Sequence, residues 1–402
     1  MSDHDDPAML SAGRNASLGG LLERIEEQFN AETQGRPDLL VDEISRRELI
    51  RDVTDYVTTA GGIKLSREDR LAVLEMVYRD LFTLSALEPL VNDPEVTEIK
   101  LKGHDQIYVR RGAGDLLGDS LTFDNAAHLE RLIERLLVGV GTSLDQSLPF
   151  CEIGLRVADR PARLTLTGAP ISVMLHVDLR LHPPQALSLS DLLPTGMLDA
   201  AATDTLTGII RAGHGLMLAG EVGSGKTTLI QALLPLMPAP TICVERAHEI
   251  TLPDGVQGLA VIPPTSERPP VEFPDQISAA LQRPIRGLAV DEIRSDESAA
   301  MWSAITSDLK PQLLFAFRGS TEPLRLRTSF SMAVRKAQQG IEQEYIHSGL
   351  IDRLPFVVML QRVRSPQPGV KVVRIGEWQI DGESLVLREM YPTRQVSPQH
   401  PF

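Results

Sequence analysis

The chain has 402 residues, carries a formal net charge of −14 and is 42% hydrophobic. A chain of this length can bury a sizeable core and is expected to form two or three domains. The acidic excess weighs against a surface that binds nucleic acid through general phosphate attraction, because that attraction needs clustered lysines and arginines. Aromatic residues make up only 4% of the chain, which leaves few stacking platforms for single strands.

The sequence also bears on the compartment. No apolar run approaches the roughly 18 residues that a membrane-spanning helix needs. The first residues are acidic, whereas a secretory signal would be basic and then apolar. We therefore expect a cytoplasmic protein. Cys151 and Cys243 lie far apart in the sequence, which favours buried core positions over a disulfide framework or a zinc site.

The N-terminal part begins with a polar segment. Residues 1–20 are rich in small and polar side chains, which predicts an unstructured tail. Apolar residues then recur at helical spacing, and Ser66 before two acidic residues predicts the start of a further helix. Residues 21–80 are therefore interpreted as a helical module.

Residues 81–181 have the mixed pattern of an α+β domain. Alternating residues at 96–101 and 106–109 flank a Gly-His-Asp turn, which predicts a β-hairpin. The later elements expected here are a helix over 125–138 and strands over 163–166 and 172–175. Residues 182–188 contain two prolines and are interpreted as a linker.

The remainder, residues 189–402, alternates short apolar runs with helix-favouring stretches. This alternation is typical of an α/β fold with a parallel sheet, whose strands are buried on both faces and read as continuous apolar runs. The predicted buried strands are residues 215–219, 241–244, 288–290 and 313–317.

A phosphate-binding loop follows the first of these strands. Residues 220–227 have the pattern Gly-x-x-x-x-Gly-Lys-Thr between an apolar run and a helix-favouring stretch. The glycines let successive N–H groups point at phosphates, and the helix start adds a favourable dipole. Lys226 is expected to bridge the β- and γ-phosphates of ATP, and Thr227 to give its hydroxyl to Mg²⁺. The predicted nucleotide-binding residues are Gly220, Glu221, Val222, Gly223, Ser224, Gly225, Lys226, Thr227 and Thr228.

Two acidic residues end the strand at 288–290. Strand ends of a parallel sheet place such side chains beside the phosphate loop. Asp291 is expected to hold Mg²⁺ through water, and Glu292 to orient the attacking water. Two acids also occur at ordinary strand ends, so the interpretation depends on the phosphate loop that precedes them.

These motifs, in this order, resemble those of the ATPases of type II and type IV secretion systems, and within them the pilus-assembly ATPases of the Flp/Tad type. Residues 244–253 resemble the family's acidic box, and residues 290–297 its Walker B segment. Residues 370–378, followed by Asp-Gly-Glu, are similar to its closing hairpin. Residues 87–99 are similar to the opening of its N-terminal domain. The resemblance spans roughly residues 87–391.

The resemblance implies a RecA-like P-loop ATPase domain over residues 189–402, preceded by the α+β domain and the helical extension. It implies Mg²⁺-dependent ATP hydrolysis by a ring, expected to be a homohexamer. The ring would act on an inner-membrane platform protein of a pilus or secretion system, as a cytoplasmic protein peripheral to that membrane.

The resemblance also implies further site residues. Glu245, in the acidic box, is expected to hold Mg²⁺ or to polarise water. Family members use arginines of the N-terminal domain to reach nucleotide, and Arg163 and Arg180 are the best candidates here. Arg318 stands at the position of the family's histidine box, beside the nucleotide.

Three departures from the family pattern leave alternatives open. The family usually has glycine where Asp291 stands, aspartate where Arg246 stands and histidine where Arg318 stands. One alternative is therefore a nucleotide-binding scaffold that hydrolyses ATP weakly. The other is a DNA-transport ATPase of a conjugation system, which the net charge of −14 disfavours.

Overall fold

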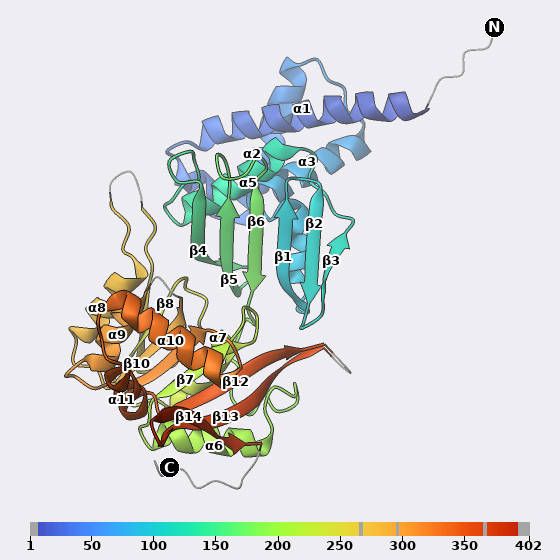
Figure 1. Cartoon of the computed structure of the whole chain (residues 1–402). Coiled ribbons are helices and arrows are strands. Elements are labelled where there is room, and N and C mark those ends of the chain that lie inside the picture. Colours follow the sequence, from blue (N-terminus) through green and yellow to red (C-terminus); the bar gives the residue numbers. More distant parts are fainter. Residues whose placement is uncertain (1–6, 265–267, 295–296, 365–367, 393–402) are drawn as a thin grey trace. The chain divides into compact units, whose positions relative to one another are not determined.

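The computed structural model describes residues 7–264, 268–294, 297–364 and 368–392. It is a mixed α/β structure with two sheets (Figure 1). The chain divides into two compact units, Met1–Asn92 with Leu121–Leu136, and Asp93–Ser120 with Leu137–Phe402. The domain boundaries predicted from the sequence group these segments differently and remain a prediction. Residues 1–6 of the predicted tail and 295–296 of the Walker B segment lie outside the described residues.

The first unit is helical. Its helices are α1 (Pro7–Thr33), α2 (Glu43–Ala60), α3 (Arg67–Phe82), α4 (Glu88–Asn92) and most of α5 (Ala126–Gly139). Residues such as Ile25, Val53 and Val77 form a core shared by α1, α2 and α3. Ser66 caps α3 as predicted, because its Oγ accepts a hydrogen bond from Asp69 N at 3.0 Å. None of the described helices combines the length and the apolar character needed to cross a bilayer.

The start of α1 differs from the prediction. The sequence predicts an unstructured tail up to residue 20, whereas α1 begins at Pro7. Residues 7–20, which the composition assigns to the tail, are part of this helix. The small and polar residues were therefore an unreliable sign of an unstructured segment.

The second unit contains a six-stranded antiparallel sheet in the order β3-β2-β1-β6-β5-β4. The strands are β1 (Val96–Lys102), β2 (Gln106–Arg111), β3 (Leu116–Asp119), β4 (Phe150–Val157), β5 (Arg160–Thr167) and β6 (His176–Leu181). The hairpin predicted over 96–109 is confirmed as β1 and β2. Cys151 on β4 is a buried free thiol.

One predicted strand of this sheet is wrong. Residues 172–175 form a bend without regular secondary structure, and the strand begins at His176 instead. Val173 is fully exposed, so the apolar residues of this segment have no sheet face to cover. From His176 onward polar and apolar residues alternate, and the apolar ones are buried in the sheet.

The second unit also contains an eight-stranded sheet in the order β14-β13-β12-β7-β11-β10-β8-β9. The strands are β7 (Leu216–Gly220), β8 (Thr241–Glu245), β9 (Val256–Ala260), β10 (Gly287–Ile293), β11 (Gln312–Arg318), β12 (Phe356–Val363), β13 (Gly369–Asp381) and β14 (Ser384–Tyr391). The four predicted strands β7, β11, β10 and β8 are confirmed as parallel neighbours. The predicted closing hairpin is the antiparallel pair β13 and β14.

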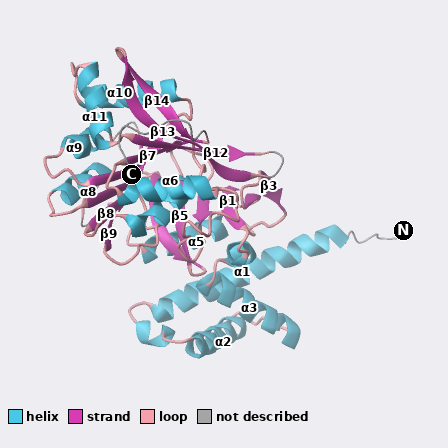
Figure 2. Cartoon of the chain, turned by 90° about the horizontal axis from the view of Figure 1, so that it is seen from below, coloured by secondary structure: helices cyan, strands magenta, loops and turns pink. Residues whose placement is uncertain are grey.

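Helices cover both faces of this sheet (Figure 1; Figure 2). One face packs against α6 (Ala200–Arg211) and α7 (Lys226–Leu233). The other packs against α8 (Phe273–Leu281), α9 (Ser298–Thr306), α10 (Pro323–Ala337) and α11 (Gln343–Arg353). Successive residues of one strand, such as Met217 and Leu218, belong to opposite cores. This two-sided burial explains the unbroken apolar runs in the sequence.

Candidate nucleotide-binding site

The predicted phosphate loop lies between the end of β7 and the start of α7. Gly223 and Gly225 have φ values of +73° and +86°, which side-chain-bearing residues adopt at a cost. Gly225 directly precedes α7, and a Cβ added there would lie 2.8 Å from Val370 Cγ1. The loop geometry therefore depends on glycine both for its backbone and for space.

We expect Gly225→Ala to weaken nucleotide binding about tenfold or more, because a left-handed residue with a Cβ is strained by roughly 1–3 kcal/mol. The dissociation constant of a fluorescent N-methylanthraniloyl ATP analogue measures the effect. Gly382→Ala is the matched control, because Gly382 has φ +62° with open space around it. Equal weakening in both variants would refute a specific role for the loop.

Lys226 is folded back onto this loop. Its Nζ donates hydrogen bonds to the carbonyl oxygens of Gly220 at 3.0 Å and Glu221 at 2.8 Å. Burial lowers the pKa of Lys226, and the carboxylates of Glu292 and Asp291 oppose that shift. Ser224 Oγ is buried and has no hydrogen-bond partner among the described residues. The loop thus holds an ammonium group and a spare hydroxyl that a phosphate could accept from.

The hydroxyl of Thr227 meets the predicted Walker B acid. Thr227 Oγ1 lies 3.1 and 3.0 Å from the two carboxylate oxygens of Asp291. Asp291 is buried, and burial together with the nearby charge of Glu249 raises its pKa to about 7. A hydroxyl beside a carboxylate is a donor set that suits Mg²⁺. The described part of the chain contains no group of three or more His, Cys, Asp or Glu side chains arranged to hold a metal, so phosphates and water would have to complete the coordination.

A β-bulge brings both acids to the loop. Between Val290 and Ile293, β10 has one more residue than β11 opposite it. Glu292 has φ +56°, which is strained for a residue with a side chain. In a regular strand Asp291 and Glu292 would point to opposite faces. Here Glu292 Oε2 lies 4.0 Å from Lys226 Nζ, so both carboxylates reach the start of α7.

Arg163 lies among buried acids. Its Nη1 is 3.0 Å from Glu249 Oε1 and 3.5 Å from Glu152 Oε1. His182 Nε2 lies 2.6 Å from the other carboxylate oxygen of Glu249. Burial alone would raise the pKa of Glu249, but Arg163 and His182 hold it below its usual value. The charges of Asp291 and Glu292 also act on Arg163, which places this arginine in the same electrostatic cluster as the two acids.

Glu245 has different contacts from those predicted. Its Oε2 accepts hydrogen bonds from the backbone N–H groups of Glu249 at 2.9 Å and Ile250 at 3.0 Å. Its Oε1 points toward Gly258 on β9, at 3.9 Å from where a Cβ would stand. These contacts hold the turn after β8 in place. They support a structural role for Glu245 Oε2. Glu245 Oε1 is buried without a hydrogen-bond partner among the described residues, so a role in holding Mg²⁺ stays a prediction.

The other predicted arginines differ in their surroundings. Arg180 Nε lies 3.6 Å from both Glu98 and Asp178 on neighbouring strands, so its charge is shared with acids of the six-stranded sheet. Arg318 ends β11 and pairs in register with Gly220 at the start of the loop. It is exposed, and its positive charge adds to the lowering of the Lys226 pKa. Arg318 is therefore beside the loop, whereas Arg180 forms ion pairs with acids of the six-stranded sheet, and its charge also acts on Glu249.

The remaining predicted residues lie at the tip of the phosphate loop and at the start of α7. Glu221 and Val222 are exposed at the tip of the loop, and Thr228 is in the first turn of α7. Arg246, which departs from the family pattern, pairs with Glu297 and lies over the ring of Phe273 at 4.8 Å. This arginine therefore stabilises the local packing.

Three residues of the site were missed in the sequence. Glu152 on β4 pairs with Arg163 and also lies 3.3 Å from Arg294. Arg294 in turn is 3.7 Å from Glu292. Arg362 on β12 lies beside the loop, where its Nη2 is 3.9 Å from the position of a Cβ on Gly223. Arg294 belongs to the predicted Walker B segment, residues 290–297, although it was not singled out as a site residue. Glu152 and Arg362 come to the site only through the strand order, so no local pattern could have identified those two.

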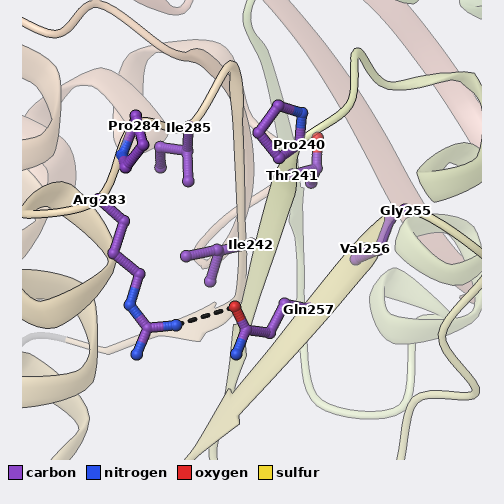
Figure 3. A pocket seen from close by; sticks show the side chains of 9 residues that line it. All are labelled: Pro240, Thr241, Ile242, Gly255, Val256, Gln257, Arg283, Pro284 and Ile285. Atoms are coloured by element: carbon purple, nitrogen blue, oxygen red, sulfur yellow. Dashed lines mark hydrogen bonds between the residues drawn. The ribbon is translucent and has the colours of Figure 1, made fainter.

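A separate cavity of about 450 Å³ lies at the opposite edge of the eight-stranded sheet (Figure 3). Thr241 and Val256, the first residues of β8 and β9, line it, and Arg283 Nη1 donates to Gln257 Oε1 at 2.8 Å. Ligands of parallel sheets bind at the carboxyl ends of the strands. The cavity lies at the amino ends and includes none of the predicted site residues.

Curated relatives and solved structures are similar to parts of the chain. A Mycobacterium tuberculosis protein named as a candidate conjugal transfer protein is 28% identical over 186 residues, which are 45% of this chain and 53% of that protein. This chain thus spans about half the length of that relative. The type IV secretion system protein PtlH of Bordetella pertussis is 27% identical over 56% of this chain and 74% of its own. The ATPase DotB of Legionella pneumophila has a TM-score of 0.49 at 16% identity, over 75% of this chain and 82% of DotB.

A family model gives the broader assignment. The model described as "Type II/IV secretion system protein" matches residues 82–308, a segment that contains both the phosphate loop and the two acids at the end of β10. This agrees with the resemblance read from the motifs. Because the match covers more than half of the 402 residues, the chain belongs to the type II/IV secretion system protein family.

Proposed function

We propose that this protein is a Mg²⁺-dependent ATPase with a RecA-like motor domain, and that it drives a pilus-assembly or type II/IV secretion system. The observation that carries the proposal is the contact of Thr227 with Asp291 next to the loop that holds Lys226. A hydroxyl, a carboxylate and an ammonium group at the start of one helix are the parts that P-loop enzymes use for phosphoryl transfer. The names of the relatives support a place in secretion or conjugation machinery.

In this mechanism each residue has a stated task. The loop amides and Lys226 bind the phosphates, and Lys226 leaves the carbonyl oxygens of Gly220 and Glu221 to do so. Thr227 and Asp291 would hold Mg²⁺, which would supply positive charge against the phosphates. Glu292 positions a water molecule for in-line attack and accepts its proton. The strained bulge fixes the direction of this carboxylate.

Family membership supports a proposal about the assembly. We propose a ring, expected to be a homohexamer, on the cytoplasmic side of the inner membrane. Binding and release of nucleotide at the loop would change the ion pairs of Arg163 and Arg294, which link the six-stranded sheet to the acids beside the loop. The resulting movement would be passed to an inner-membrane platform protein.

The test is ATP hydrolysis by the full chain with and without Mg²⁺, together with Glu292→Gln. We expect Mg²⁺-dependent turnover in the wild type and a loss of about 100-fold in kcat in the variant, because a positioned base contributes at least that factor. Binding of the fluorescent ATP analogue should remain within about threefold, since Glu292 acts on water rather than on nucleotide. Equal turnover in both proteins would contradict the role of Glu292.

A second candidate is a scaffold of the same machinery that binds ATP and hydrolyses it weakly. Arg318 in place of the family's histidine favours it, because this exposed side chain ends the strand next to the loop. Nucleotide binding without turnover in the wild type would support the scaffold, and Arg318→His should then raise the turnover. Stimulation of turnover by DNA would instead favour a conjugation ATPase.

A further inference from the structure

Two arginines lie on either side of the phosphate loop. In the sheet, β7 is flanked by β12 on one side and β11 on the other. Arg318, at the end of β11, pairs in register with Gly220. On β12, Met359 pairs with Ala219, so Arg362 lies three residues further toward the carboxyl edge. β12 also passes close to the loop, because a Cβ on Gly220 would be 2.5 Å from Leu360 O.

Neither guanidinium has a hydrogen-bond or ion-pair partner among the residues that the structure describes. In the described part of the chain, Arg318 and Arg362 make no hydrogen bond and no ion pair through their side chains, and Arg362 Nε is buried. Burial and the nearby charge of Arg110 lower the pKa of Arg362. Leaving a buried donor unsatisfied costs roughly 1–3 kcal/mol, more when the group is charged. This cost applies to Arg362 Nε, and a ligand that places an acceptor there would remove it.

The charges around Arg362 do not supply them. Glu98 and Asp115 act on it favourably, while Arg110 and Arg364 act unfavourably, and none forms an ion pair with it. By contrast, Arg364, two residues further along the chain, is strongly exposed and pairs with Asp115 at 3.9 Å. Of these two arginines, Arg362, which lies beside the phosphate loop, is therefore the one without an ion pair among the described residues.

A polyphosphate is the chemistry that fits this arrangement. Lys226 and the start of α7 already present positive charge at the loop, and Arg318 and Arg362 add two more cations in a chain with a net charge of −14. Planar guanidinium groups match phosphate oxygens in a two-pronged geometry and stay charged. A ligand with several negatively charged oxygens can contact all three cations at once, whereas a neutral or singly charged ligand cannot.

We propose that Arg362 binds the polyphosphate of ATP from the β12 side of the loop, opposite Arg318 on the β11 side. The inference deepens the proposed function and rests on it. Arg362 thereby helps to select a triphosphate over less charged ligands, because each guanidinium gains more from a ligand with more negative charge.

The experiment compares Arg362→Ala with Arg364→Ala in the full chain. Dissociation constants for the N-methylanthraniloyl analogues of ATP and ADP are measured with Mg²⁺ at several NaCl concentrations. Arg362→Ala should weaken binding of the ATP analogue about tenfold and flatten its salt dependence, because one charged contact to phosphate is lost. Arg364→Ala should stay within about twofold of the wild type, since exposed ion pairs contribute little. Arg362→Lys should recover part of the loss.

Each remaining outcome is decisive. If the wild type binds the ATP analogue well and the dissociation constant of Arg362→Ala is within about twofold of it, the inference is overturned. The proposed function is then unaffected. No binding by the wild type would refute both. If Arg362→Ala does not fold by circular dichroism, Arg362→Gln replaces it, because glutamine keeps most of the stem and removes the charge; unchanged affinity and salt dependence in that variant would equally overturn the inference.

Discussion

Replacing Lys226 with alanine is expected to lower kcat/KM for Mg²⁺-dependent ATP hydrolysis about 1,000-fold, because the variant loses the buried cation that stabilises charge on the transferred phosphate. Lys226 is only 3% exposed and is held at the loop by two carbonyl oxygens and the carboxylate of Glu292. Steady-state hydrolysis of ATP by the purified full chain measures the effect.

The control for this variant is Lys64→Ala, which removes the same charge from an exposed loop of the helical unit. It should hydrolyse ATP at the wild-type rate. If Lys226→Ala keeps the wild-type kcat/KM, the loop is not the site of hydrolysis, and the activity must be sought elsewhere in the preparation. If the wild type and Lys226→Ala both bind nucleotide but neither hydrolyses it, the scaffold function is favoured.

Arg163→Ala is expected to destabilise the protein by about 3 kcal/mol or more, which removing one partner of a buried ion pair typically costs. The variant leaves Glu249 fully buried with His182 as its remaining partner. For a domain of this size the melting temperature should fall by about 5 °C or more. Thermal unfolding followed by circular dichroism measures it. Arg156→Ala on the neighbouring strand is the control, because that arginine is exposed, and it should change stability by at most about 0.5 kcal/mol.

A second substitution isolates the cause. Adding Glu249→Gln to Arg163→Ala replaces the buried charge by a neutral amide, so the double variant should melt above Arg163→Ala alone. If it melts at or below the single variant, the loss comes from packing rather than from the unpaired carboxylate. This comparison also separates the role of Arg163 in stability from any role it has toward nucleotide.

The stability that the buried Glu249 carboxylate and Arg163 contribute depends on pH in a predictable direction. Arg163 and His182 hold the pKa of Glu249 below its usual value of 4.5, despite burial. The stabilisation is therefore fully present above that usual value and is lost as the pH falls through the lower folded pKa. The difference in melting temperature between wild type and Arg163→Ala should be largest near about pH 8 and should narrow toward about pH 4. A constant difference would show that the charge of Glu249 is not involved.

The strained position of Glu292 connects structure and proposed chemistry. A left-handed residue with a side chain costs free energy, and such positions cluster where a side chain must be aimed. In this protein the bulge turns Glu292 toward Lys226 while Asp291 stays at Thr227. The structure therefore separates the two adjacent acids, with Asp291 at the hydroxyl of Thr227 and Glu292 near the ammonium group of Lys226.

Local patterns in the sequence determined much of the fold. The helices after residue 20, the β1–β2 hairpin and the four central parallel strands follow from periodicity, caps and turn residues, which act over a few residues. The phosphate loop and the acids at 291 and 292 were visible for the same reason. A strand that ends in a glycine-rich loop before a helix is specified by contiguous residues, and so is a strand that ends in two acids.

Tertiary structure alone decided the rest. Arg362 comes to the loop because β12 lies next to β7, a neighbour more than 130 residues away in the chain. Glu245 Oε2 accepts a hydrogen bond from the turn that follows β8. Glu152 forms ion pairs with Arg163 and Arg294. The spacing of these residues in the sequence does not predict either contact. The bulge that aims Glu292 depends on the pairing of β10 with β11. Which side chains share a site is set by strand order and register, and both are settled by burial of the whole sheet rather than by any short segment.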